Sequence, residues 1–422
     1  MTRNIYTPEG FDPRTYLPER LWKNADAANY LLHIIEWNRV CYRRRRSDYI
    51  PLKAAYLNNT MGRWVAKDIR TALEAEGVIE IDPQYFPGEK SRGYRLGPKL
   101  RDATFRRQPT TAKLAKKLKT HKMYMKPRLP VHKYLYSWLT RLEVDHEAAM
   151  RSLQTGDELI DKYIALDMIA DRQFYMVPDD YGRLHTNVSS LSRTLRPFLH
   201  YGDDKLVLLD LKNSQPFFFS LLLLNYYAND RSLDSFYTYN TSDKKKKGRR
   251  GKGPAITIDI LSMLNRISLV KLDLPQDVKD YISLTETGKL YEELVTVFDA
   301  RDREEAKTAL FKWVLFCKPR KNKYHSLFRC RFPSVSAVID ALKEKEYRRL
   351  SHHLQKCESA AMIHGVCGRL RDDFPDVPVW TIHDCVMTTK PYLDPVRTVV
   401  REQFAAMSLK PTISEQDFTL AA

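Results

Sequence analysis

Two apolar runs far apart in the chain each lead to an aspartate. Leu206–Leu209 is followed at once by Asp210, and Val377–Ile382 is followed one residue later by Asp384. Short apolar, partly β-branched runs of this kind are typical of strands inside a core sheet. A second β-prone run, Val386–Thr389, comes after Asp384, which predicts a hairpin with this aspartate at its turn. The pattern therefore predicts two carboxylates at strand ends, where a charge can reach solvent.

The hydrophobic pattern near the N-terminus predicts a small module in residues 48–98. Apolar residues recur at helical spacing in its second helix, and Gly77 is placed to end that helix. The order of helix, turn, helix and two-stranded wing resembles a winged helix, whose second helix usually enters the major groove of duplex DNA while a basic wing contacts phosphates. A protein-interaction module of the same fold is the alternative. The expected elements are helices over 51–58 and 62–76, strands over 78–81 and 94–96, and a basic loop from Pro87 to Gly93 between the strands.

Residues 99–175 are mostly polar and compatible with helices. Their basic opening is either a solvated surface or part of a helical arm that lies along a duplex. A second basic run, residues 244–253, is rich in glycine and predicts a surface loop. The basic opening contains Lys113, Lys116, Lys117, Lys119, Lys122, Lys126 and Arg128.

The net charge narrows the class of partner. The chain has 422 residues, 43% of them hydrophobic, so two or three globular domains are expected. Lysine and arginine number 70 against 52 aspartates and glutamates, which gives a net charge of +18. Such an excess is typical of a protein that holds a polyphosphate backbone, although solubility alone would also explain it.

The cysteines and the lack of long apolar runs indicate where the protein works. No run is long enough to span a membrane, and the first residues lack the apolar stretch of a signal peptide. A soluble, cytoplasmic protein without a membrane partner is therefore expected. The cysteines have no zinc-site spacing, which predicts reduced thiols that are neither ligands nor disulfides. They are Cys41, Cys317, Cys330, Cys357, Cys367 and Cys385.

Two carboxylates brought side by side repel each other unless a cation lies between them. Mg²⁺ takes carboxylate and phosphate oxygens, and a pair of such ions catalyses in-line phosphoryl transfer. We therefore expect Asp210 and Asp384 to hold two Mg²⁺ ions, for which Mn²⁺ can substitute.

Between about residues 180 and 390 the chain resembles the polymerase core of the bacterial DNA polymerase I family (family A), whose palm is shared with single-subunit phage-type RNA polymerases. Four signatures occur in the order of the family. The first, Gly182 to Thr186, is similar to a Gly-Arg-Leu stretch that precedes the first palm strand. The resemblance implies that Arg183 approaches the primer-template backbone.

The second signature, Asp210 to Gln215, is similar to motif A of the family. The resemblance implies that the carboxylate of Asp210 and the backbone carbonyl of Leu211 bind the metal ions. Ser214 and Gln215 fall two positions later than in the family. The choice between deoxyribonucleotides and ribonucleotides therefore stays open.

The third signature is the spacing Arg303, Lys307 and Phe311, which matches motif B. Steps of four residues place the three side chains on one face of a helix. Two cations there can neutralise a triphosphate while the aromatic ring stacks on a base, although an ordinary amphipathic helix gives the same pattern. The next aromatic of the family corresponds to Leu315, with Phe316 beside it.

The fourth signature, Thr381 to Asp384, is similar to motif C. It implies that His383 approaches the primer terminus and that Asp384 holds a metal ion. A helix upstream corresponds to the family helix that places a glutamine beside the minor groove of template and primer, and Gln355 is the candidate for that role. Whether Glu304, Glu305 or Glu358 adds a carboxylate to the metal site stays open.

The resemblance implies an α+β fold: a right-hand polymerase of palm, fingers and thumb, with a small N-terminal winged-helix domain. Too few residues precede this core for a 3′→5′ exonuclease domain, so no proofreading is expected. The expected domains are residues 1–98 for the winged helix with its core at 48–98, 99–175 for a helical thumb or linker, and 176–422 for palm and fingers, with the fingers at about 255–345.

The predicted function is template-directed nucleotidyl transfer, with a DNA template-primer and nucleoside triphosphates as partners. A small DNA polymerase of a plasmid, phage or mobile element is the first hypothesis. An RNA polymerase or primase on the same palm is the second. The third is a non-catalytic replication initiator that binds duplex DNA through residues 48–98.

Overall fold

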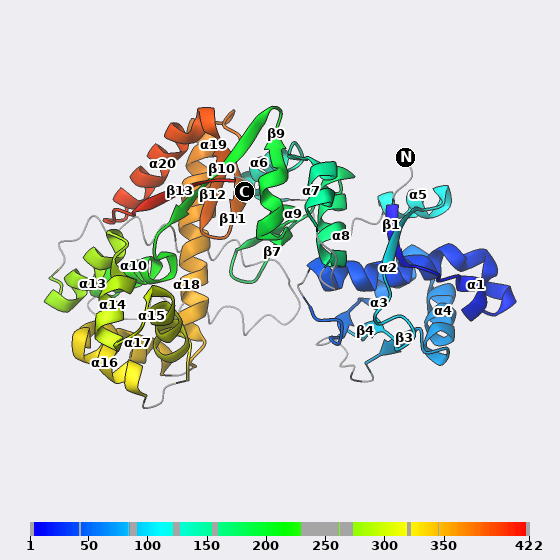
Figure 1. Cartoon of the computed structure of the whole chain (residues 1–422), viewed down its shortest axis with the longest axis horizontal. Coiled ribbons are helices and arrows are strands. Elements are labelled where there is room, and N and C mark those ends of the chain that lie inside the picture. The colour runs from blue at the N-terminus through cyan, green and yellow to red at the C-terminus, as the bar shows by residue number, and fades with distance from the viewer. Residues whose placement is uncertain are drawn as a thin grey trace. The chain divides into compact units, whose positions relative to one another are not determined.

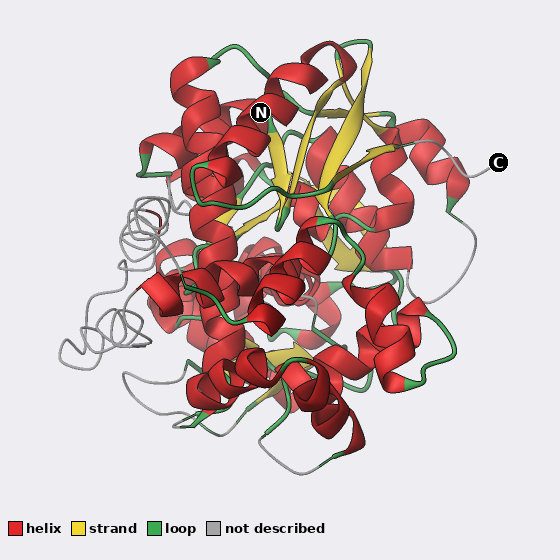
Figure 2. Ribbon diagram, turned by 90° about the vertical axis from the view of Figure 1, so that its left-hand side faces the viewer, coloured by secondary structure: helices red, strands yellow, loops and turns green. Residues whose placement is uncertain are grey.

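The computed structural model describes residues 4–41, 44–82, 84, 91–120, 127–153, 159–228, 261, 273–318, 322–344 and 346–418. The fold mixes helices and sheets, and helices predominate (Figure 2). The chain divides into two compact units. Within the described part, no helix combines the length and the apolar character needed to cross a bilayer. The N-terminal unit comprises Met1–Lys126, Glu143–Tyr175 and Ser190–Phe198, and the C-terminal unit comprises Pro127–Leu142, Met176–Ser189 and Leu199–Ala422.

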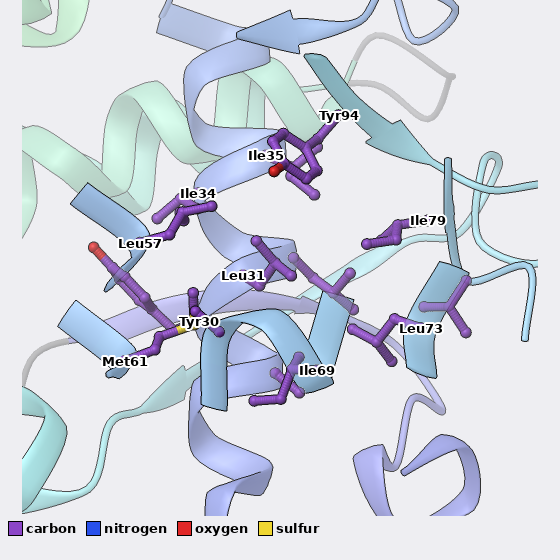
Figure 3. Close-up of a cluster of buried hydrophobic side chains, with 14 of the residues drawn as sticks. Tyr30, Leu31, Ile34, Ile35, Leu57, Met61, Ile69, Leu73, Ile79 and Tyr94 are labelled. Carbon is purple, nitrogen blue, oxygen red and sulfur yellow. The ribbon is translucent and has the colours of Figure 1, made fainter. Parts of the chain in front are cut away.

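Helix α2 (Ala25–Cys41) supplies much of the core of the N-terminal unit. Its buried side chains Leu31 and Ile35 meet apolar side chains from two further helices and two strands (Figure 3). One of those helices, α4 (Arg63–Ala75), buries residues spaced three and four apart, which gives it a single apolar face. Its opposite face is exposed and carries Arg63, Trp64 and Lys67.

The expected helices and strands near residues 50–96 are present, with one strand more than the sequence indicated. Helix α3 (Ala54–Met61) and α4 are followed by β3 (Ile79–Ile81) and β4 (Gly93–Leu96). A further strand, β2 (Ile50–Pro51), pairs with β4 and completes a three-stranded sheet in the order β2-β4-β3. The helix expected from Pro51 therefore begins only at Ala54, because Pro51 lies in an edge strand, where its missing N–H costs no ladder bond. Wing residues Pro87, Gly88 and Lys90 lie outside the described residues.

The expected helical region 99–175 is shared between the two units. Residues 127–142, which include α6 (Pro130–Leu139), belong to the C-terminal unit, and the flanking parts belong to the N-terminal unit. Lys122, Lys126 and the basic run 244–253 lie outside the described residues. The remaining elements of the N-terminal unit are β1 (Asn4–Pro8), which pairs with β5 (Phe105–Pro109), α1 (Pro13–Tyr16), η1 (Glu19–Asn24), α5 (Ala112–Thr120), β6 (Glu143–Val144), α7 (His146–Ser152), α8 (Leu159–Ala170) and η2 (Arg193–Phe198).

The C-terminal unit contains an antiparallel sheet built on β10 (Asp204–Leu211). One edge of β10 pairs with β12 (Cys385–Thr389), which forms a hairpin with β11 (Trp380–Ile382). Two further partners are β13 (Ile413–Asp417) and, at the start of β10, β9 (Leu199–Tyr201). Figure 1 shows β10, β12 and β13 side by side. The apolar runs of the sequence are thus strands, as their composition predicts, and the structure shows that they are neighbours in one sheet.

Helices surround this sheet. One long continuous helical stretch consists of α18 (Arg349–Ser359), a π-helical segment η5 (Ala360–Val366) and α19 (Cys367–Asp373). Helix α10 (Ser214–Ala228) directly follows the turn after β10 and packs on α18. The other elements of this unit are β7 (Met176–Pro178), β8 (Leu184–Thr186), α9 (Asn187–Ser190), α13 (Gln276–Glu286), α14 (Leu290–Phe298), α15 (Arg303–Ala309), η4 (Leu310–Leu315), α16 (Lys323–Arg331), α17 (Pro333–Lys343), η6 (Lys390–Tyr392) and α20 (Leu393–Ala405).

Candidate metal and nucleotide site

The pairing of β10 with β12 brings the two predicted aspartates together. Asp210, near the end of β10, lies directly opposite Cys385, the first residue of β12. Asp384 is the preceding residue and belongs to the two-residue turn of the β11–β12 hairpin. Ligand atoms of Asp210, Asp384 and Cys385 all lie within 4.8 Å of one another, and all three residues are half-buried.

Left-handed backbone positions flank both aspartates. His383, the other residue of the hairpin turn, has a φ of 54°, and Asn213, which links β10 to α10, has a φ of 53°. Side chains with a Cβ rarely adopt this conformation, although histidine and asparagine are among those that tolerate it best. Such backbone positions often occur at functional sites, where the surrounding structure offsets their cost. His383 also contacts His185 of β8 edge to face, with ring centroids 6.2 Å apart.

A buried ion pair joins Arg183 to helix α18. The Arg183 guanidinium donates from Nε to Glu358 Oε1 at 2.7 Å and from an Nη to Oε2 at 2.5 Å. Gln215, in the first turn of α10, donates its amide N–H to the same Oε2 at 2.6 Å. The side chain of Glu358 is only 1% exposed. Three segments that are distant in sequence are therefore tied together at one carboxylate.

The environment of Glu358 opposes its ionisation. Burial is the main cause that raises the pKa of Glu358, to about 7, and the nearby negative charge of Asp384 acts in the same direction. The hydrogen bonds and the positive charge of Arg183, together with the hydrogen bond from Gln215, lower the pKa but do not outweigh the burial. The carboxyl is thus close to its titration midpoint at neutral pH.

Glu358, a residue of α18 whose role the sequence left open, contacts the motif residues Arg183 and Gln215. Gln355 lies on the same helix and is half-buried. Glu304 and Glu305 form ion pairs at the start of α15: Glu304 pairs with Lys307, and Glu305 pairs with Arg301. Among the described residues, the carboxylates that gather at the candidate metal site are those of Asp210 and Asp384.

Helix α15 begins with the first of the predicted triphosphate-binding cations. Arg303 donates to Glu292 at 3.1 Å and covers the ring of Tyr291, with its guanidinium carbon 4.9 Å from the ring centroid. Lys307 lies 3.5 Å from Glu304. Both cations are well exposed, and ion pairs of this kind contribute little to stability, so an incoming anion can replace their partners at small cost.

Tyr291 is influenced by charges from both α15 and the candidate metal site. Its ring is buried, and burial raises the pKa of the Tyr291 hydroxyl well above its usual range. Arg303 lowers that pKa, and Asp384 raises it further. Such charge effects require proximity, so the start of α15 and the hairpin turn lie within electrostatic reach of the same tyrosine.

The third predicted member of this face, Phe311, is not on a regular α-helix. It lies in the π-helical segment η4, where the backbone N–H of Phe316 donates to the carbonyl of Phe311 at 2.9 Å. A π turn brings residues five apart, and not four apart, onto one side. The rings of Phe311 and Phe316 are therefore stacked, with centroids 5.4 Å apart and an interplanar angle of 17°. Leu315, which the sequence aligned with the family aromatic, is instead fully buried.

The donor set at the hairpin suits a divalent cation. Two carboxylates and a thiol, with ligand atoms within 4.8 Å of one another, offer oxygen and sulfur ligands to one ion. Leu211, whose backbone carbonyl is the further predicted ligand, directly follows Asp210 on β10. Nothing in the sequence indicated that Cys385 lies beside the two aspartates. Only the strand register places this thiol next to Asp210, and the spacing of cysteines along the chain carries no trace of it.

Comparisons with known proteins do not identify a family for this chain. No protein-family model matches this sequence, and no curated protein does. A solved structure of the POL domain of Pol1 from M. smegmatis, in complex with DNA primer-template and dNTP, aligns with 94% of this chain and 82% of that chain, at 12% identity and a TM-score of 0.34. A TM-score this low does not establish a common fold, so the interpretation below rests on the residues of the site.

The pKa of Glu358 predicts how stability depends on pH. A carboxyl whose pKa is higher in the folded state than in the unfolded state stabilises the fold at low pH and loses that effect as the pH rises through the folded pKa. Between pH 4.5 and pH 7.5 the metal-free wild type should therefore lose roughly 3 kcal/mol of unfolding free energy relative to Glu358→Gln. Urea unfolding of both proteins across this range measures the difference. A constant difference would show that folding leaves the pKa of Glu358 unchanged.

Proposed function

We propose that this protein is a template-directed nucleotidyltransferase, and most specifically a small DNA polymerase without proofreading that uses two Mg²⁺ ions. The observation that carries the proposal is the meeting of Asp210 and Asp384 at the end of one sheet, with their ligand atoms within 4.8 Å. This arrangement fits a divalent cation and leaves an oxygen-rich site for phosphates. The cations at the start of α15 support a triphosphate as the ligand, because Arg303 and Asp384 both act on the pKa of Tyr291.

The residues of the site have distinct roles in this proposal. Asp210 and Asp384, with the carbonyl of Leu211, would hold the ions, which when bound neutralise phosphate charge and lower the pKa of an attacking hydroxyl. The cations Arg303 and Lys307 would clamp the triphosphate by exchanging Glu292 and Glu304 for phosphate oxygens.

The bases and the primer would meet other side chains. Phe311 and Phe316 would stack on the incoming base, and the template would supply the sequence information. His383 would approach the primer terminus from the hairpin turn. Arg183 is held by Glu358 near this turn and would contact the primer-template backbone, with Gln355 further along α18 as a second contact.

Substitution of the aspartates tests the catalytic proposal. Asp384→Asn and Asp210→Asn keep the side-chain shape but remove the charge that binds the cation. Each should lower primer extension at least about a thousandfold, since metal ions contribute several kcal/mol to such reactions. Asp204→Asn is the matched control, because Asp204 is exposed at the opposite end of β10 and should retain activity.

The same reaction separates the alternative functions. A DNA polymerase extends a primed template with deoxynucleotides, whereas an RNA polymerase or primase prefers ribonucleotides and starts chains without a primer. If the wild type incorporates neither nucleotide with Mg²⁺ or Mn²⁺, the catalytic proposal fails, and specific binding of a duplex through residues 48–98 would then support a non-catalytic initiator.

The stacked phenylalanines lead to a prediction about nucleotide affinity. Loss of a base-stacking ring costs about 1–3 kcal/mol, so Phe316→Ala should raise the KM for the nucleotide about 5- to 100-fold. Steady-state kinetics at saturating primer-template measure this effect. Phe374→Ala removes a comparably exposed ring directly after the end of α19 and should leave the KM unchanged. Equal effects of the two substitutions would contradict a stacking role.

The N-terminal unit is proposed to bind duplex DNA through α4. Its exposed face carries Arg63, Trp64 and Lys67, and Trp64 is 69% exposed with the Arg63 guanidinium over its ring. A cationic helix face with an exposed aromatic ring suits contact with phosphates and with the edge of a groove. Together with the proposed catalytic site, such binding would recruit synthesis to a duplex of a plasmid, phage or mobile element.

Salt dependence of DNA binding tests this role of α4. Lys67→Ala should weaken duplex binding for all sequences and reduce the slope of log affinity against log salt by about one. Lys23→Ala makes the same charge change outside α4 and should have little effect on either quantity. An unchanged slope for Lys67→Ala, measured by fluorescence anisotropy, would leave α4 to a protein partner.

A further inference from the structure

The thiol of Cys385 points at both aspartates of the proposed metal site. Its Sγ donates to Asp210 Oδ1 at 3.0 Å and lies 3.9 Å from Asp384 Oδ1. The three ligand atoms occupy a space less than 4.8 Å across, which is small enough for one ion to contact them all. Nothing in the proposed function requires sulfur at this position.

The position of this thiol is determined by the sheet. Cys385 is the direct partner of Asp210 in the antiparallel pair, and residues opposite each other project their side chains from the same face. On the next pair along the strands, Leu209 and Val386 project to the other face and are buried. A slip of one residue would bury Asp210, so the thiol and the carboxylate are held together by the hydrophobic packing of the strands.

Two other cysteines of this unit have the surroundings of thiols that only fill space in a core. Cys357 and Cys367 are buried among apolar side chains, and burial raises the pKa of each thiol to about 12. Cys385 differs from both because it is half-buried and its hydrogen bonds go to carboxylates. It therefore has the polar surroundings of a ligand, whereas the other two fill space in the core.

We propose that Cys385 is a third ligand of the cation held by Asp210 and Asp384, and that this site prefers borderline or soft divalent ions such as Zn²⁺ and Co²⁺ to Mg²⁺. The inference rests on the proposed metal site and concerns its ion selectivity. Thiolate ligands bind Zn²⁺ and Co²⁺ strongly, whereas Mg²⁺ selects oxygen ligands and keeps its water. Coordination replaces the S–H bond with a sulfur–metal bond and releases the proton to solvent.

Direct titration of the metal-free full chain with Co²⁺ tests the inference without any nucleotide. In the presence of a phosphine reductant, wild-type protein should develop a thiolate-to-Co²⁺ charge-transfer band in the near ultraviolet at one equivalent. Cys385→Ser should lose the band, and its Zn²⁺ affinity, measured by competition with a chromophoric chelator, should fall at least about tenfold. Cys385→Asp should also lose the band but keep Mg²⁺ affinity, because it offers oxygen in place of sulfur.

Control variants assign the signal to one thiol. Cys317→Ser and Cys330→Ser remove cysteines that are more accessible than the buried ones, and both should retain the full band. A wild type without a band, or a band that persists in Cys385→Ser, overturns the inference. Circular dichroism of each variant confirms that the fold is kept, which the near-equal size of serine and cysteine favours.

Primer extension keeps this inference separate from the proposed function. Zn²⁺ should inhibit Mg²⁺-supported synthesis by the wild type at concentrations at least about tenfold lower than those that inhibit Cys385→Ser. If the Co²⁺ band appears but no nucleotide is incorporated, the thiol ligand stands and the polymerase proposal fails. If synthesis occurs but the band is absent, the polymerase proposal stands and the thiol ligand fails.

Discussion

The antiparallel register of β10 and β12 determines the position of every ligand at the candidate metal site. Because Asp210 is opposite Cys385, the neighbouring turn residue Asp384 must come next to Asp210 as well. The two carboxylates repel each other by an energy on the order of a few kcal/mol at the effective dielectric constant of a protein surface. Burial of the apolar side chains on the same strands offsets this repulsion, because it stabilises the strand pairing whatever the charge at its end. A bound cation would convert the repulsion into attraction, which is how a stable sheet can present an energetically unfavourable pair of charges.

A second constraint comes from the carboxylate of Glu358. Its bonds to Arg183 and Gln215 connect the β7–β8 turn, the start of α10 and the C-terminal end of α18. Removal of one partner from a buried ion pair typically costs about 3–5 kcal/mol, because the remaining charge loses its compensation. The network therefore restricts where the turn with Arg183 can lie, and through His185 it also restricts the hairpin turn that contains His383. The metal site and the backbone-binding residues are in this way parts of one packed assembly.

Local patterns in the sequence predicted the elements but not the contacts between them. The strand ends at Asp210 and Asp384 and the amphipathic helix α4 could be predicted because hydrophobic periodicity is a local property. The register that places Cys385 beside Asp210, and the long-range bond between Glu358 and Arg183, depend on packing between segments 175 residues apart. Strand β2 was missed for a related reason, since a two-residue edge strand is defined by its partner β4 and has no periodicity of its own. The roles assigned to the motif residues remain predictions.

The π-helical segment at Leu310–Leu315 has a consequence for how this chain is compared with others. A π turn holds one residue more than an α turn, so the segment behaves as a single-residue insertion at the C-terminal end of the helix that begins with α15. Any alignment that runs through it without a gap equates Leu315, a core residue, with a position that Phe316 fills in space. Phe316, which directly follows the segment, is then out of step by one, and its match to an aromatic residue of another helix goes undetected. An ungapped comparison by sequence thus gives the wrong register at the segment that carries the stacked rings of Phe311 and Phe316.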